Sequence, residues 1–179
     1  MAAEKYVYGI KKIKFGKPTG TASMPTGANT ATAWAQTVAG SLVLSEDEAT
    51  TKDFNVEEVS TPVKTIVTSV GALTATWRSY DITPALLTVV KGGTATSTGS
   101  GTGKKAVFYG PETVKALDLA LEIITDNDVV INVYKAAVLA RFDGGVGKEN
   151  LLELEVRAVA QDPGDGGVPY AIKLPDPTA

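Results

Sequence analysis

The sequence predicts a mainly β fold with one short α-helix and a long extended hairpin arm. Val, Ile, Thr and Tyr, which are enriched in strands, are frequent, and clusters of Gly and Pro interrupt the chain at short intervals. Residues 73–80 and 149–161 alternate apolar and polar side chains with the period of a strand. With 179 residues and 44% hydrophobic content, residues 1–179 are expected to form a single domain.

The first part of the chain predicts two strands separated by an irregular connection. Residues 5–15 form the first candidate strand, in which a pair of lysines interrupts the alternation and predicts a bulge near Lys11. Residues 16–32 are rich in Gly, Pro, Thr and Ala and predict an irregular connection. A short strand is expected over residues 37–44, followed by an acidic turn at residues 45–48.

Residues 50–70 predict the extended hairpin arm. Its two strand-like stretches, 50–59 and 62–70, are joined around Ser60-Thr61-Pro62. The arm has too few apolar residues to hold itself against a core, and an isolated two-stranded ribbon is marginal in water. It is therefore either mobile or packed on another molecule. The candidate assembly residues are the apolar side chains of the arm together with Trp34, an interface candidate in the irregular early segment: Phe54, Val56, Val59, Val63, Ile66, Val67 and Trp34.

Residues 83–91 predict the one short helix. Thr83 provides an N-cap, and Pro84 occupies the first helical position, where its missing N–H is not needed. The Gly92-Gly93 pair ends the helix. Residues 92–104 then predict a Gly-rich loop of low complexity.

The period of two predicts further strands in the second half. The stretch 113–125 contains helix-forming residues, but its apolar side chains alternate strictly from Leu117 to Ile123, which favours a strand. In the stretch 149–161, Leu154 belongs to the buried face, and Glu153 belongs to the charged, solvated face. The strands expected here are 105–109, 113–125, 129–141, 149–161 and 170–174.

Residue types needed for common catalytic and metal sites are missing. The chain has no Cys and no His, which excludes disulfides, thiolate zinc sites, cysteine nucleophiles and histidine bases. Residues 99–104 superficially resemble a phosphate-binding loop, but Thr98 stands where that loop needs Gly, and Lys105 stands where it needs Ser or Thr. We therefore expect no enzymatic activity, no catalytic residue, no cofactor and no metal.

The acidic clusters predict turns and solvated faces. The clusters at 126–128 and 162–165 lack the spacing of a calcium-binding loop, and turn chemistry explains both. The carboxylates at 57–58 and 153–155 lack the apolar pocket that would tune one of a glycosidase pair. A net charge of −3 predicts no basic face for nucleic acid. No stretch predicts a membrane anchor or a secretory signal.

In the order of its features, the chain resembles the bacteriophage major tail protein (tail tube protein) family. The resemblance spans roughly residues 5–174, and the long segment 16–36 departs from the simplest members of the family. The features that carry it are the opening Tyr8-Gly9-Ile10 with Phe15-Gly16, the strand Leu73–Trp77, the helix opening Asp81–Leu87, Gly92-Gly93-Thr94, the stretch 129–140, and the stretch 149–158 before a Gly- and Pro-rich end.

This resemblance implies a β-sandwich or barrel-like domain with one short flanking α-helix. It also implies a structural virion protein that self-assembles into stacked rings, usually of six subunits. The rings form a tail tube around the tape measure protein, end at a tail terminator and later conduct the genome, with only transient, non-specific passage of DNA. It also implies assembly in the cytoplasm of the host bacterium and a final location in the phage tail. The arm at 50–70 would reach a neighbouring subunit.

Two other classes of function stay open. One is another β-rich virion component, such as a tail terminator or a capsid decoration protein. The other is a carbohydrate-binding β-sandwich module, in which Trp34, Trp77 and a tyrosine would stack on sugar rings. Trp77 lies on a patterned strand, however, and a place in the core is the simpler expectation for it.

Overall fold

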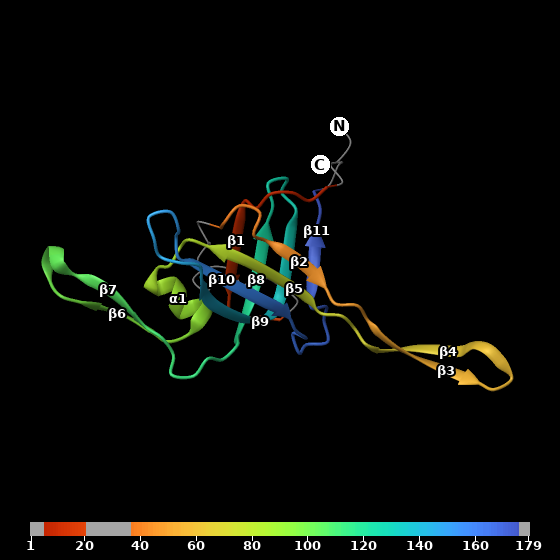
Figure 1. Ribbon diagram of the computed structural model, residues 1–179. Helices are drawn as coiled ribbons and strands as arrows, with labels where there is room; N and C mark the ends of the chain where they lie inside the picture. The colour runs from red at the N-terminus through yellow and green to blue at the C-terminus, as the bar shows by residue number, and fades with distance from the viewer. Residues whose placement is uncertain (1–5, 21–36, 176–179) are drawn as a thin grey trace.

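The computed structural model describes residues 6–20 and 37–175, which form a mainly β fold with one α-helix (Figure 1). Strands make up 51% of the structure and helical segments 7%, which confirms the predicted fold class. Trp34 lies outside the described residues. The elements are β1 (Lys12–Gly16), β2 (Val43–Glu46), β3 (Thr50–Val56), β4 (Val59–Ser69), β5 (Leu73–Ser79), α1 (Pro84–Lys91), β6 (Thr94–Thr98), η2 (Gly101–Gly103), β7 (Lys105–Tyr109), β8 (Leu117–Ile124), β9 (Val130–Asp143), β10 (Glu153–Ala160) and β11 (Tyr170–Lys173).

The body of the protein is one seven-stranded antiparallel sheet that bends into two layers. Its strand order is β1-β8-β9-β10-β5-β2, and β11 pairs with β9 beside this path. The long strand β9 belongs to both layers, because residues 130–138 pair with β8 and residues 136–143 pair with β10 (Figure 1). The resulting fold is sandwich-like, with the two layers joined through a shared strand.

A bulge in β9 allows this strand to belong to both layers. Leu119 of β8 pairs with Ala136, but Leu121 pairs with Val133, so β9 has one extra residue between the two pairs. Because successive side chains of a strand point to opposite faces, one extra residue moves the core-facing set from odd to even positions. Ile131 and Val133 are buried before the bulge, and Val138 and Ala140 are buried after it. The bulge therefore lets both halves of one strand face the same core.

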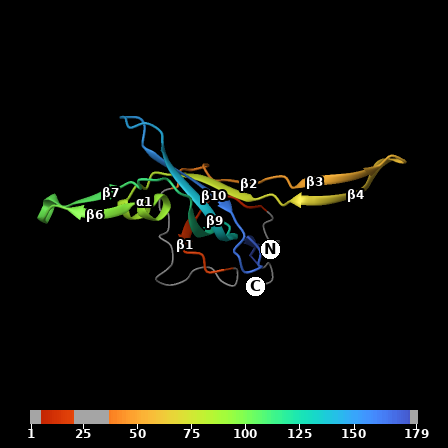
Figure 2. The same ribbon diagram turned by 90° about the horizontal axis from the view of Figure 1, so that it is seen from below.

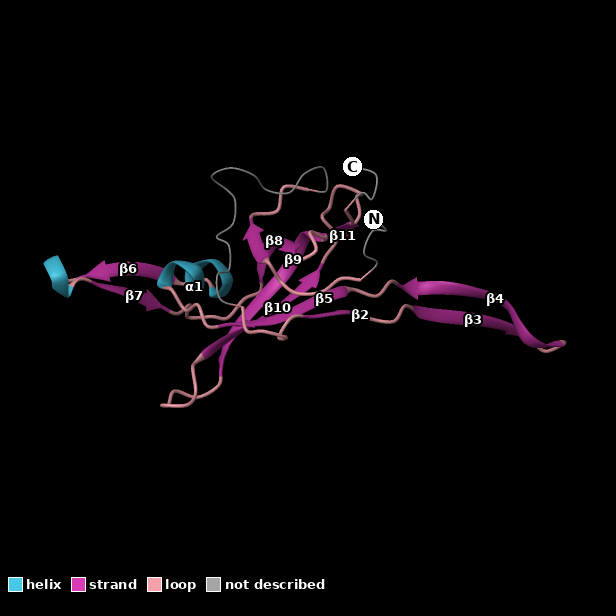
Figure 3. Ribbon diagram, turned by 90° about the horizontal axis from the view of Figure 1, so that it is seen from above, coloured by secondary structure: helices cyan, strands magenta, loops and turns pink. Residues whose placement is uncertain are grey.

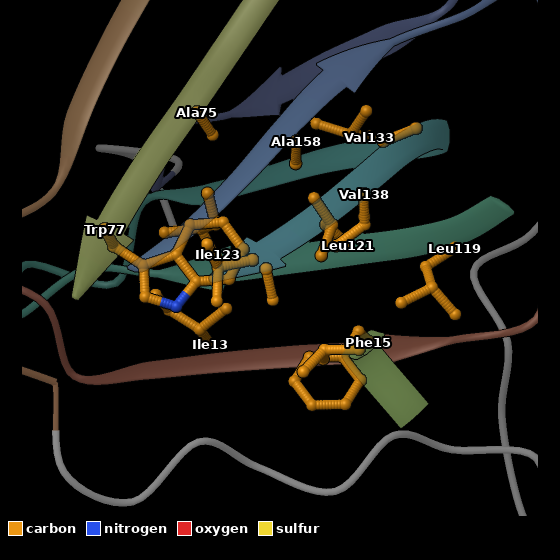
Figure 4. Close-up of a cluster of buried hydrophobic side chains, with 14 of the residues drawn as sticks. Ile13, Phe15, Ala75, Trp77, Leu119, Leu121, Ile123, Val133, Val138 and Ala158 are labelled. Atoms are coloured by element: carbon orange, nitrogen blue, oxygen red, sulfur yellow. The ribbon is translucent and has the colours of Figure 1, made fainter. Parts of the chain in front are cut away.

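The core lies between the two layers, and α1 covers one end of it. Trp77 is completely buried and points toward side chains from β1 and β8 (Figure 4). The buried residues of α1 are Leu86, Leu87 and Val90. The helix begins after Thr83 and ends at Gly92, whose φ of 75° suits glycine, so its predicted boundaries are confirmed.

Two hairpins leave the body on opposite sides (Figures 1 and 2). One is β3–β4, the arm predicted from the sequence. The other is β6–β7, and it corrects the prediction of a loop over residues 92–104, because residues 94–98 form a strand paired with 105–109. The alternating Thr residues of this stretch explain the difference, since β-branched side chains suit a strand even where Gly is frequent nearby. Only the tip of the hairpin remains a Gly-rich loop.

The first predicted strand is shorter in the structure. β1 begins at Lys12, and residues 6–10 run instead across the turn between β8 and β9. There the Asp126 N–H donates to the Tyr8 carbonyl at 3.3 Å, and the Asn127 amide donates to the Tyr6 carbonyl. These contacts hold the segment away from the ladder, so the alternation of its sequence did not produce a strand.

The second predicted strand and the acidic turn are displaced along the chain. β2 covers Val43–Glu46 instead of residues 37–44, so the first two residues of the predicted turn at 45–48 are paired with β5. Residue Thr37 forms only an isolated bridge to Ser79. Pairing with a neighbouring strand thus outweighs the turn preference of Ser45 and Glu46.

Candidate functional site

The β3–β4 arm extends the ladder of β2 and β5 beyond the body. Glu46 pairs with Leu73 in the body, and Thr50 pairs with Ser69 in the arm, so the register is kept across an irregular junction at 47–49 and 70–72. One hydrogen bond, from the Asp47 N–H to the Ala72 carbonyl at 3.2 Å, bridges the junction. The arm is therefore a continuation of a core ribbon and leaves the body in a defined direction.

A glycine is required at this junction. A Cβ atom at Gly71 would lie 1.6 Å from the carbonyl oxygen of Asp47. The two backbones can approach this closely only because residue 71 has no side chain. This contact has no signature in the sequence, because Gly also occurs in ordinary turns.

The apex of the arm lies at Glu57-Glu58, and the turn predicted around 60–62 is wrong. Val56 pairs with Val59 across this apex, and residues 60–63 of β4 have no paired partner in β3. Pro62 falls within this unpaired stretch, where its missing N–H costs no ladder hydrogen bond. Proline therefore marks an irregularity in the strand here and not the turn itself.

The arm has two different faces, because cross-strand partners share a face. Lys52 pairs with Ile66, Phe54 pairs with Lys64, and Val56 pairs with Val59, which places these residues on one side. The Lys52 ammonium lies 5.4 Å from the centre of the Phe54 ring. We call this side the apolar face, and it consists of Phe54, Val56, Val59 and Ile66, flanked by Lys52 and Lys64.

The opposite face of the arm is more polar. Thr51 pairs with Val67, and the Thr65 hydroxyl donates to the Asp53 carboxylate at 2.5 Å. Of the predicted assembly residues, four thus gather on the apolar face, Val67 lies on the other, and Val63 lies in the unpaired stretch.

Most of the apolar side chains of the arm are exposed. Phe54 is 44% exposed and Val63 is 63% exposed, whereas apolar side chains of the body such as Trp77 and Leu154 are fully buried. The arm projects away from the body, so the body does not cover them (Figure 3). Contiguous exposed apolar side chains on a projecting element are typical of an interaction site.

The β6–β7 hairpin has a basic tip. Its base packs against α1, with Phe108 against the core. Its tip contains η2, followed by Lys104 and Lys105, both exposed. The stretch that resembles a phosphate-binding loop thus joins two strands, whereas such a loop must lead into a helix.

Acidic side chains of the body form ion pairs with arginines of the same chain. Arg78 contacts Asp143 at 3.2 Å, Glu153 at 3.4 Å and Glu155 at 3.7 Å. Arg141 donates to Glu155 at 2.9 Å, and this hydrogen bond together with the charge of Glu155 raises the pKa of Arg141. The face of β10 that the sequence predicts to be charged and solvated therefore carries a cross-strand ion network.

The Asp clusters that could suggest calcium form turns. Asp128 has a φ of 59° and contacts Lys11 at 2.8 Å. Asp162 and Asp165 accept hydrogen bonds from the Gly164 and Gly167 N–H groups at 2.8 Å and 3.0 Å. Within residues 6–20 and 37–175, no group of three or more acidic side chains is placed to hold a metal ion.

One cavity of about 500 Å³ opens between the segment around Tyr8, strand β2 and the β8–β9 turn. Its lining is mainly apolar and includes Ile10, Leu42 and Asp126. Trp77 does not line it, because its side chain is completely buried in the core. Trp77 is therefore not available as a stacking platform for a sugar.

In comparisons with known proteins, no protein-family model and no curated protein matches this chain. In the described part of the chain, no helix has the length and apolar character required to cross a membrane. The likeness to tail tube proteins accordingly rests on the order of features along the sequence.

Tyr170 connects β11 to the base of the arm and gives a testable pH dependence. Its hydroxyl donates to the Glu46 carboxylate at 3.0 Å. This hydrogen bond, followed by desolvation and the charge of Glu46, raises the pKa of Tyr170 above its usual value of 10.0. The contribution to stability is present below the unfolded-state pKa and is lost as pH rises through the folded-state pKa.

NMR titration of ring-labelled tyrosines, with Tyr170→Phe to assign the signal, is expected to show Tyr170 ionising above its usual range. In Glu46→Ala the pKa of Tyr170 should move back toward 10.0. An unchanged titration in Glu46→Ala would contradict the contact.

Proposed function

We propose that this chain is a structural virion protein that self-assembles into stacked rings forming a phage tail tube, a conduit for genome delivery. The observation that carries the proposal is the β3–β4 arm, which leaves the body with its apolar face exposed. Such a ribbon is marginal alone in water, so a second surface that covers Phe54, Val56 and Val59 gives the arm its stability.

The ends of the sheet support homo-oligomerisation. β1 and β2 are the terminal strands of the sheet order, and each has an unpaired edge within the described part of the chain. Open edges favour pairing with another chain, and closure into a ring satisfies them without unlimited aggregation. A ring of six subunits follows from the family resemblance.

The partners and location of the protein follow from the same proposal. Stacked rings would surround a tape measure protein, end at a tail terminator and let DNA pass without holding it. The net charge of −3 supports this last point, because a tube that attracted phosphates would slow the genome. Assembly would take place in the host cytoplasm, and the finished protein would lie in the virion without a membrane anchor.

Electron microscopy and light scattering of the purified chain over a concentration series test the proposal. We expect rings that stack end to end into hollow tubes at high concentration. Rings that never stack would favour a tail terminator or another virion component. A chain that stays monomeric at every concentration, at low and high salt, would falsify the tube and leave glycan binding as the next function to test.

A further inference from the structure

We propose that the tip of the arm of one copy docks on the tip of the β6–β7 hairpin of the next copy. The arm ends in the acidic apex, which we define as Glu57 and Glu58. The other hairpin ends in the basic tip, which we define as Lys104 and Lys105. This inference rests on the proposed function and specifies which surfaces of two copies meet.

The placement of the two hairpins permits this contact only between copies. They leave the body on opposite sides, with the sheet between them (Figures 1 and 3). One chain therefore cannot bring its own two tips together. A contact between two different patches of identical chains is heterologous, so each copy offers one free apex and one free tip to its neighbours. Repetition of the contact leads to a ring or to a filament.

The two tips carry opposite charges that are free to form ion pairs with another copy. All four side chains are exposed, and none of them forms an ion pair among the described residues. The ion network of Arg78 and Arg141, by contrast, is satisfied inside the body. Each tip carries two like charges, and bringing an apex and a tip together places opposite charges near one another.

Apolar side chains flank the acidic apex and extend the contact. Val56 and Val59, 45% and 48% exposed, pair directly beside it on the apolar face. Next to the basic tip, Thr98 pairs with Lys105 and Thr96 pairs with Val107, so β-branched side chains lie beside this tip. The contact thus combines opposite charges at the ends with apolar burial along the two ribbons.

Electrostatics of this kind act mainly on orientation and association rate. Exposed ion pairs contribute only about 0.2–1 kcal/mol each, but complementary charges can speed encounter by orders of magnitude at low salt. We therefore expect the charges to set the rate and register of assembly, and the apolar face to set how long the contact lasts. The Debye length of about 10 Å at 0.1 M salt makes the rate sensitive to ionic strength.

A charge-swap experiment on the full chain tests the inference. Three variants are compared with the natural chain: Glu57→Lys with Glu58→Lys, Lys104→Glu with Lys105→Glu, and all four changes together. Because the fourfold variant keeps the net charge, it is the matched control for a general charge effect. Light scattering after dilution into low salt gives the assembly rate, and circular dichroism checks that each variant is folded.

Each double variant should assemble about tenfold more slowly than the natural chain or worse. The fourfold variant, and an equimolar mixture of the two double variants, should recover the natural rate. Double variants that assemble at the natural rate, or a fourfold variant as slow as the doubles, would overturn this inference while leaving the tube intact. A natural chain that never assembles would overturn the proposed function and this contact with it.

Discussion

Leu154→Asp is expected to prevent folding. Leu154 is completely buried in β10, between Ser79 of β5 and Phe142 of β9. Loss of the leucine packing costs about 2–5 kcal/mol, and an unpaired buried carboxylate adds several more. The whole stability of a domain is about 5–15 kcal/mol, so the folded state would be lost or nearly so. Circular dichroism and thermal melting of the purified variant measure this directly.

Glu153→Ala is the matched control on the adjacent residue. Glu153 points to the outer face, where it contacts Arg78 at 3.4 Å. Arg78 keeps Asp143 and Glu155 as partners after the change, and an ion pair at the surface contributes only about 0–1 kcal/mol. The control should therefore melt within a few degrees of the natural chain. Equal melting temperatures and equal solubility for both variants would overturn the assignment of the two faces.

The sequence predicted most of the body correctly because one face of each strand is buried. Over most of β5 and β10, polar and apolar side chains alternate, and the buried positions Trp77 and Leu154 match the expected ones. The boundaries of α1 were predictable for a different reason. Pro84 and Gly92 act through the local backbone, so their effect is independent of tertiary packing, whereas Thr83 has the extended backbone of an N-cap without a side-chain capping hydrogen bond.

The errors arose where distant contacts decided the local structure. The bulge in β9 lies where the partner on its other edge changes from β11 to β10, an arrangement that the sequence of β9 alone does not encode. The start of β1 depends on hydrogen bonds between this segment and the β8–β9 turn: Lys11 donates to Asp128, 117 residues away along the chain, and Asn127 donates to the Tyr6 carbonyl, 121 residues away. The strand β6 was missed because Gly and Ser around it outweighed its β-branched threonines.

The candidate site was only partly predictable. Composition located the arm, since its low apolar content contrasts with the strands beside it, but composition does not assign a face. Pairing in the arm places Phe54 and Ile66 on one face and Val67 on the other. Counting alternate positions along the sequence does not predict these faces, because residues 60–63 are unpaired. Glu57-Glu58 and Lys104 lie at the tips of hairpins on opposite sides of the body (Figure 2), an arrangement that depends on the tertiary structure and not on the local sequence.

Removal of the arm is expected to abolish assembly while leaving the body folded. Thr50 and Ser69 are cross-strand partners, so residues 51–68 can be replaced by an Asn-Gly turn that closes the ribbon at that pair. The core lies wholly within the body, and no residue of the arm belongs to it. We therefore expect natural melting behaviour, a monomer in light scattering, and no rings or tubes in electron micrographs.

Two variants that keep the arm test whether assembly needs its apolar face and not only its presence. Phe54→Ser with Ile66→Thr removes apolar side chains from the apolar face, and Thr51→Ser with Val67→Thr makes a matched change on the opposite face. If the apolar face is the contact surface, the first variant should require about tenfold more protein to assemble, because burial of such side chains contributes about 1.5–3 kcal/mol each when complete. The second variant should assemble at nearly the natural concentration. An arm-deleted chain that still forms tubes would remove the arm from the assembly, and one that unfolds would show that the arm belongs to the fold of the body.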